Sequence, residues 1–198
     1  MFGKASKSLA NKLVKKNIIA KEDFEVYQFG METFLMKAFH IISYLVIGAV
    51  FFRLPELLVF LAAFIPLRES SGGYHAGTAL KCYVMSCATV ISFLCFLVFL
   101  PDSMMEYSLV LALAASLFLF LIVPVETGNK PLEDAERTYY KSKAGFIIII
   151  EFGLVLIFRM VEWKELSFIL ALSLSYELVI ALAGFYVNRT IPGCKHVE

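Results

Sequence analysis

The main pattern along the chain is a series of six apolar segments separated by polar stretches. A straight helix needs about 20 apolar residues to cross a bilayer, and most of the segments approach that length. The sequence therefore predicts an all-α, polytopic integral membrane protein with six transmembrane helices. The six apolar segments are residues 33–52, 55–67, 80–100, 107–123, 144–158 and 166–187.

Residues 1–30 precede the first apolar segment and have a different pattern, with apolar positions on about half of a helical wheel and lysines mostly opposite. We expect a basic amphipathic helix over residues 4–29 that lies on an anionic leaflet, where it could also contact a membrane-bound substrate. These residues lack the continuous apolar core of a cleavable signal peptide, so we expect none. The apolar positions are Leu9, Ala10, Leu13, Val14 and Ile18, and the lysines are Lys4, Lys12, Lys15 and Lys16.

The distribution of lysine and arginine predicts the orientation of the chain. With six spans both termini lie on one side, together with all of the 18 lysines and arginines except Arg53, Arg159 and Lys164. Because basic residues collect on the cytoplasmic side, we expect a multi-pass protein of the cell membrane with both termini in the cytoplasm. The two large polar stretches, residues 68–82 and 124–143, lie on the same predicted side.

The composition supports a membrane protein and narrows its chemistry. Hydrophobic residues make up 60% of the 198 residues and the mean hydropathy is +0.77, whereas soluble domains are about half apolar. The length fits a single membrane domain over residues 1–198, and the net charge of +1 gives no reason to expect a nucleic-acid partner. The four cysteines show no disulfide spacing, and Cys194 and His196 are too few for a metal site. We therefore predict reduced thiols and no metal or cofactor.

The second apolar segment, residues 55–67, is short, and we expect Pro66 to end or kink its helix. A short span would leave Arg68 and Glu69 recessed below the lipid headgroups, in a place with restricted access for water. A locally thinner bilayer is the alternative.

The first polar stretch, residues 68–82, combines a histidine, a cysteine and several glycines. Cysteine proteolysis needs a thiolate and a base that generates it, and Cys82 and His75 could supply both. Thr78 could cap the next helix, which would place Cys82 in its first turn, where the partial positive charge of the helix and the adjacent Lys81 favour a thiolate. The alternative is that His75 is an interfacial loop residue and Cys82 a packing residue. Gly72, Gly73 and Gly77 could let the loop fold back and leave N–H groups free for an oxyanion.

The second polar stretch, residues 124–143, has two prolines around Gly-Asn, which predict a stiff turn, followed from Leu132 by a short helix. Glu126 and Asn129 could orient His75, as the third member of a triad does, or could fix the turn. For Arg68 we expect a pairing with Glu69, with Glu126 or with a substrate carboxylate. Within the apolar segments, we expect Glu151 and Glu177 to face the interior and bond to Ser173, Ser175 or a tyrosine.

The two polar stretches together resemble those of the AgrB family, the membrane endopeptidases of Gram-positive quorum sensing. The resemblance lies in Arg68, in Gly72-Gly73-Tyr74-His75-Ala76 with Cys82, and in Pro124-Val125-Glu126 with Asn129-Lys130-Pro131-Leu132. It extends to the size, the basic N-terminus and the pattern of spans.

The resemblance implies an activity and a partner. The substrate would be an AgrD-like propeptide with an amphipathic leader and an acidic tail. His75 and Cys82 match the catalytic histidine and cysteine of the family. Cys82 would cleave the tail as an acyl-enzyme thioester, and a cysteine or serine of the peptide would then close a thiolactone or lactone. Arg68, Lys130, Arg137, Lys141 and Lys143 could hold the acidic tail, although the positive-inside rule alone explains many of them. The resemblance also suggests a homodimer.

Two other functions would explain part of the sequence. A non-enzymatic exporter or peptide-binding scaffold would carry polar residues through several spans, whereas here most polar residues lie in two loops. A metal-dependent intramembrane enzyme would need more ligands than three histidines without an HExxH motif supply.

Overall fold

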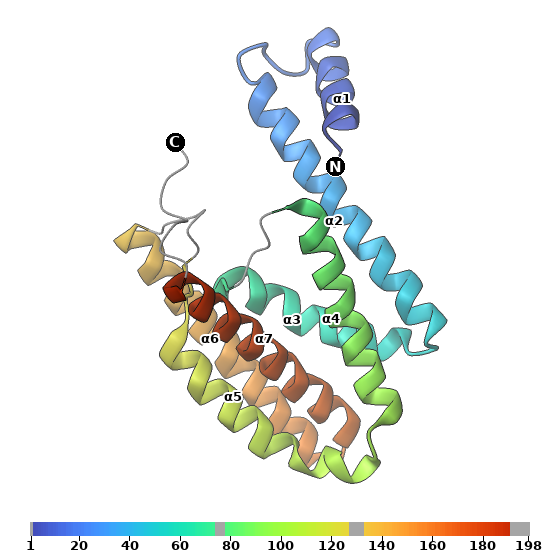
Figure 1. The fold of residues 1–198 in the computed structure, drawn as a ribbon, viewed down its shortest axis with the longest axis vertical. Helices are drawn as coiled ribbons and strands as arrows, with labels where there is room; N and C mark the ends of the chain where they lie inside the picture. Colours follow the sequence, from blue (N-terminus) through green and yellow to red (C-terminus); the bar gives the residue numbers. More distant parts are fainter. Residues whose placement is uncertain (1, 74–77, 127–132, 191–198) are drawn as a thin grey trace. The chain divides into compact units, whose positions relative to one another are not determined.

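The computed structural model describes residues 2–73, 78–126 and 133–190, and in this part of the chain the secondary structure is helical, which confirms the all-α prediction (Figure 1). Each of the six apolar segments predicted from the sequence lies within or largely within a helix. The helices are α1 (Gly3–Lys15), α2 (Phe24–Val50), α3 (Leu54–Ser71), α4 (Ala79–Phe99), the 3-10 helix η1 (Asp102–Tyr107), α5 (Ser108–Ile122), α6 (Asp134–Met160) and α7 (Lys164–Thr190).

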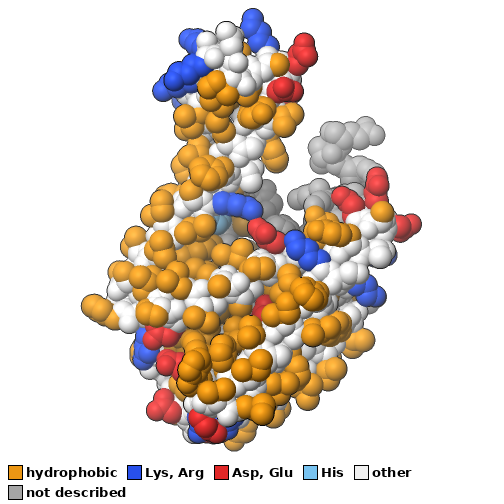
Figure 2. All heavy atoms as spheres, turned by 180° about the vertical axis from the view of Figure 1, so that it is seen from behind, with side chains coloured by type: hydrophobic (Ala, Val, Ile, Leu, Met, Phe, Trp, Pro, Cys, Tyr) orange, Lys and Arg blue, Asp and Glu red, His pale blue; other side chains and the backbone are white. Residues whose placement is uncertain are grey.

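Four stretches of helix in the described part are long and apolar enough to cross a membrane: Phe24–Val50, Ala79–Phe99, Asp102–Ile122 and Lys164–Val187. Hydrophobic side chains cover much of the outward surface of the helices (Figure 2). These observations are consistent with a multi-pass membrane protein. α3 and α6 hold the two shortest predicted segments and are not among the four, so the number of six spans stays a prediction.

The N-terminal helix is shorter than the predicted amphipathic helix. α1 ends at Lys15, and Asn17 adopts a left-handed conformation with φ of 53°, which interrupts the helix before α2 begins at Phe24. Ser6 and Ala10 are fully buried, and α1 lies along the first part of α2 (Figure 1). Of the predicted apolar face only Ala10 is buried, so part of the face that would meet the leaflet packs against protein.

α3 continues through Pro66, which differs from the expected end of the helix at that residue; the alternative, a kink, stays a prediction. The helix ends only at Ser71, and the Ser70 hydroxyl donates to the Pro66 carbonyl oxygen over 2.9 Å. A proline removes one backbone donor, and the residues that follow it continue the helix. Arg68 and Glu69 therefore belong to the last turn of α3 and not to a loop.

α6 begins earlier than the fifth apolar segment. Glu133 and Glu136 form a capping box at its first turn, which satisfies backbone N–H groups that have no partner within the helix. The helix then runs without interruption for 27 residues. The polar residues 134–143 are thus the exposed start of a long helix, and not a loop or a separate short helix.

The chain divides into two compact units, residues 1–52 with 77–91 and residues 53–76 with 92–198. In the second unit α3, α5 and α6 all pack against α7. Phe60 of α3 stacks on Phe93 with ring centroids 4.0 Å apart, and the Tyr176 hydroxyl donates to Ser92 over 3.0 Å. The single membrane domain stays a prediction. The buried cluster of this unit includes Leu67, Leu119, Val125, Ile148, Leu174 and Ala181.

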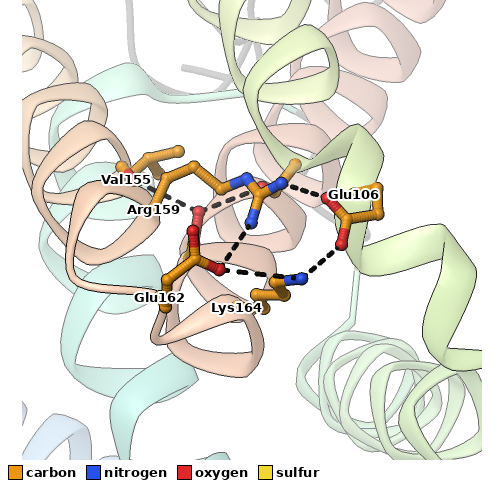
Figure 3. A network of polar contacts seen from close by, with 7 residues as sticks. Glu106, Val155, Arg159, Glu162 and Lys164 are labelled. Atoms are coloured by element: carbon orange, nitrogen blue, oxygen red, sulfur yellow. Dashed lines mark hydrogen bonds and ion pairs between the residues drawn. The ribbon is translucent and has the colours of Figure 1, made fainter.

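An ion-pair network joins the ends of several helices in the second unit (Figure 3). The Glu106 carboxylate of η1 accepts hydrogen bonds from Arg159, at the end of α6, and from Lys164, at the start of α7. The distance from Lys164 Nζ to Glu106 Oε1 is 2.6 Å. Arg53, before α3, lies 2.8 Å from Glu56, whose hydrogen bond raises the pKa of the guanidinium. All three cations assigned to the non-cytoplasmic side thus have carboxylate partners.

Candidate active site

Thr78 caps the start of α4, as the sequence predicts. Its hydroxyl oxygen accepts a hydrogen bond from the Lys81 N–H over 3.3 Å, and its carbonyl oxygen accepts one from the Cys82 N–H over 3.0 Å. The first N–H groups of a helix have no partner within it, so such a cap stabilises the start. Cys82 is therefore in the first turn of α4, where it is a half-buried free thiol.

A group of aromatic and hydroxyl side chains in the first unit lies near Cys82. The Tyr44 hydroxyl is 3.4 Å from His40 Nδ1, and the Tyr83 hydroxyl is 3.0 Å from Ser43 Oγ. His40 packs on Tyr83 with ring centroids 5.2 Å apart, and Tyr44 lies within electrostatic range of Cys82. The sequence analysis did not single out Tyr44, although its spacing of four residues from His40 places both on one face of a helix.

The two polar stretches meet at a short backbone pairing in the second unit. The Val125 N–H donates to the Ser71 carbonyl oxygen over 2.8 Å, and the Gly73 N–H donates to the Val125 carbonyl oxygen over 3.2 Å. The Gly73 N–H is thus occupied, contrary to the expectation that it would be free for an oxyanion. Gly72 and Gly73 have φ of 72° and 110°, a region that glycine adopts without strain. This pairing fixes the chain two residues before His75.

Arg68 lies directly against this turn and has a partner that the sequence analysis did not name. Its Nη1 is 3.8 Å from Glu177 Oε1, and the Glu177 side chain is fully buried. A Cβ atom added to Gly73 would lie 2.9 Å from the same Nη1. The expectation of a pairing with Glu69 or Glu126 did not foresee Glu177. A buried carboxylate strongly favours a cation as its partner, and the packing of α7 against α3 brings the Glu177 carboxylate within reach of Arg68.

The remaining predicted site residues divide into those that the structure describes and those that it does not. Glu126 forms an ion pair with Arg137 of α6 over 2.8 Å, which links the second polar stretch to the start of α6. Glu151 is buried beside Ser173, whereas Ser175 donates to the Ala171 carbonyl oxygen. His75, Asn129 and Lys130 lie outside the described residues, as do Cys194 and His196.

Among the residues that the structure describes, no group of three or more histidine, cysteine, aspartate or glutamate side chains is arranged to hold a metal ion. The described part of the first unit thus contains a thiol at a helix start. Separately, the described part of the second unit contains a backbone turn next to an ion pair.

Comparisons with known proteins identify the family. The sequence profile of the family described as AgrB, accessory gene regulator B, matches residues 6–183. A protein named as AgrB-like from Clostridium perfringens strain SM101 is 24% identical over 199 aligned positions, which cover 98% of this chain and 93% of the relative. A second protein named as AgrB-like, from strain 13 of the same species, is 24% identical over 202 positions with the same coverage. No solved structure matches. Because the family profile covers most of the chain, the protein belongs to the accessory gene regulator B (AgrB) family.

Proposed function

We propose that the protein is a membrane cysteine endopeptidase that removes the tail of an AgrD-like propeptide and closes the remaining peptide into a thiolactone or lactone for quorum sensing. Membership of the AgrB family indicates a part in the processing of an autoinducer peptide. The observation that carries the proposal is the position of Cys82, the thiol of the family motif, in the first turn of a helix that Thr78 caps.

The proposed reaction has two acyl transfers. His75 takes the proton of the Cys82 thiol, and the sulfur attacks the carbonyl carbon of the scissile peptide bond. The C–N bond breaks, the imidazolium returns the proton to the leaving amine, and the peptide remains as a thioester on Cys82. A thiol or hydroxyl of the same peptide then loses its proton to His75 and attacks the thioester. The bond to Cys82 breaks, the sulfur recovers the proton and the cyclic product leaves.

Cyclisation through a thiol has little driving force, because one thioester replaces another. The acyl-enzyme therefore has to be protected from water, and the internal nucleophile has to be held near the carbonyl carbon. A site at the membrane boundary is suited to the first requirement. The pairing of Gly73 with Val125 is suited to the second, because it orders the backbone at a position two residues before the proposed base in the sequence.

The basic residues available to hold an acidic tail differ in their existing contacts. Arg68 is near Glu177 and Arg137 is paired with Glu126, so neither offers its full charge to a peptide. Lys141 and Lys143 are exposed in the first turns of α6. We propose these two lysines as contacts for the tail, together with Lys130, which lies outside the described residues.

The proposed cytoplasmic orientation also gives α1 a role. Lys4, Lys7, Lys12 and Lys15 line one exposed surface of this helix, with Ser8 and Asn11 between them. Lysines near an anionic leaflet attract its headgroups. We propose that this surface binds anionic lipids. The homodimer remains a proposal that rests on the family resemblance.

Single substitutions test the activity. Cleavage is measured on a synthetic peptide with an amphipathic leader, a central cysteine and an acidic tail. We expect Cys82→Ala and His75→Ala to abolish cleavage while the protein still inserts into the membrane. Cys87→Ala is the matched control, because Cys87 is also a half-buried thiol of α4 but lies beyond the first turn. Full cleavage by either of the first two variants would contradict the proposal.

A further inference from the structure

A buried ion pair supports the turn that leads to His75. Arg68 is in the last turn of α3 and Glu177 is in the middle of α7, with 3.8 Å between Nη1 and Oε1. The Glu177 side chain has no exposed surface, and that of Arg68 is 19% exposed. The guanidinium therefore has one side against a carboxylate in the bundle and another against the backbone of the turn.

The contact between Arg68 and the turn leaves almost no free space. An added Cβ atom on Gly73 would lie 2.9 Å from Arg68 Nη1 and 3.1 Å from the Ile180 carbonyl oxygen. Ile180 is in the same helix as Glu177, less than one turn further along. Gly73 is thus held between the guanidinium and the backbone of α7, and its N–H donates to the Val125 carbonyl oxygen. A displacement of Arg68 would remove one of the surfaces that hold Gly73.

Burial explains why Glu177 controls the position of Arg68. An isolated buried charge is costly, and removal of one member of a buried pair leaves the other uncompensated. Without the carboxylate, we expect the Arg68 guanidinium to turn toward water and away from Gly73. The side chain of Glu177 thus acts on the turn through Arg68.

We propose that Glu177 is a positioning residue for the proposed reaction: through Arg68 it fixes the Gly72–Gly73 turn, which precedes His75 in the sequence. This inference rests on the proposed function, because it gives His75 the role of the base. It adds to that function a residue from α7, far along the chain from both polar stretches.

Glu151 provides a matched control. It is a second glutamate buried in the same bundle, 3% exposed, and lies in α6 beside Ser173. Glu151→Gln makes the same change of a buried carboxyl group to an amide as Glu177→Gln. The carboxylate paired with Arg68 remains in place. A general effect of losing a buried carboxylate would appear in both variants, whereas an effect through Arg68 would appear only in Glu177→Gln.

The test uses the full-length protein in detergent and measures two properties. The first is the rate of cleavage of the synthetic peptide. The second is the pH dependence of the alkylation of Cys82 by iodoacetamide, with the labelled cysteine located by mass spectrometry. A purely structural role would change stability without changing this pH dependence. A displaced base would change it, because the base sets the fraction of reactive thiolate.

We expect Glu177→Gln to slow cleavage about 10²-fold, the size of effect that a misplacement of about 1 Å produces, and to move the alkylation profile toward that of His75→Ala. Glu151→Gln should match the unchanged protein in both properties. Arg68→Gln/Glu177→Gln should be no slower than Arg68→Gln, because the two residues act as one unit. If Glu177→Gln does not fold, the inference is tested on the Arg68→Gln/Glu177→Gln double variant, because that variant leaves neither charge uncompensated.

Three outcomes would overturn the inference. The first is an unchanged cleavage rate and alkylation profile in Glu177→Gln, or in the double variant if Glu177→Gln does not fold. The second is an equal loss in Glu177→Gln and Glu151→Gln, and the third is that the losses in Arg68→Gln and Glu177→Gln multiply in the double variant. The proposed function fails in a different way. If His75→Ala cleaves at the full rate, the base is wrongly assigned, and the inference falls with it.

Discussion

Gly73 and Val125 are joined by a hydrogen bond of 3.2 Å from the Gly73 N–H to the Val125 carbonyl oxygen, which connects the two polar stretches of the family motif. The Val125 N–H donates in return to Ser71. The two stretches are distant in the sequence, and each alone would be a surface turn. Through this pairing, the second stretch supports the backbone of the first.

Gly72→Ala should disrupt this pairing. An added Cβ atom would lie 2.2 Å from the Val125 carbonyl oxygen, and φ of 72° already disfavours a side chain. The strain of a non-glycine residue in such a conformation is about 1–3 kcal/mol, and the steric clash adds to it. We expect a lower melting temperature in detergent and a large loss of peptide cleavage.

The control for this substitution is Gly153→Ala in α6, where no atom lies within 4 Å of the added Cβ. Alanine is favoured over glycine inside a helix by about 0.5–1 kcal/mol, so this variant should be at least as stable as the unchanged protein. Equal behaviour of the two variants would show that the Gly72 turn tolerates a side chain and does not fix the loop.

Thr78→Ala should weaken the start of α4. The loss of an N-cap costs about 1 kcal/mol, and a frayed first turn loses the partial positive charge of an ordered helix start. We predict slower alkylation of Cys82 at neutral pH and slower cleavage. Both rates are measured on the full-length protein, beside the rate of alkylation of Cys87.

Thr89→Ala serves as the comparison, because the Thr89 hydroxyl donates to the Met85 carbonyl oxygen in the interior of the same helix. Its removal should leave the reactivity of Cys82 unchanged. If Thr78→Ala also leaves that reactivity unchanged, the helix start does not activate the thiol.

Glu106→Gln should affect stability and not activity. Glu106 bridges Arg159 and Lys164 at the exposed ends of η1, α6 and α7 (Figure 3). A neighbouring ion pair joins Arg53, before α3, to Glu165, at the start of α7. The 18 residues of α3 separate Arg53 from Gly72. At 1.5 Å per residue that distance is about 27 Å. We expect a small fall in melting temperature that disappears at high salt, because screening weakens exposed ion pairs.

The cleavage rate of Glu106→Gln is the second measurement, and it should equal that of the unchanged protein. A marked loss of cleavage would mean that the network acts on the site across the length of the helices. Such a result would require a connection that the described contacts do not provide.

The hydrophobic pattern was sufficient to place the helices that contain the six apolar segments, because the backbone N–H and C=O groups of such a segment must form hydrogen bonds where it meets lipid or protein. The start of α4 was also predictable, since Thr78 capping is a local interaction. The path of α3 beyond Pro66 was not. A proline excludes one hydrogen bond but does not decide whether the next residues continue the helix, and here Arg68 is helical.

The pairing of Arg68 with Glu177 could not be read from the sequence. The burial of Glu177 was expected from its place in an apolar segment, but the expected partners were the hydroxyl groups of Ser173, Ser175 or a tyrosine and not a guanidinium. The choice depends on how α3 packs against α7, a contact between distant parts of the chain. The end of α1 at Lys15 was missed for a different reason, because the left-handed conformation of Asn17 leaves no mark in the hydrophobic pattern.

The central claim is that Cys82 forms a thioester with the peptide, and the acyl-enzyme itself is the most direct evidence for it. The protein is mixed with the synthetic peptide and quenched with acid, and the labelled residue is located by mass spectrometry. We predict an adduct on Cys82 with the mass of the peptide without its tail, absent from Cys82→Ala and released by hydroxylamine. Cleavage of the peptide by Cys82→Ala, or an adduct on Cys87 or Cys95 in place of Cys82, would contradict the claim.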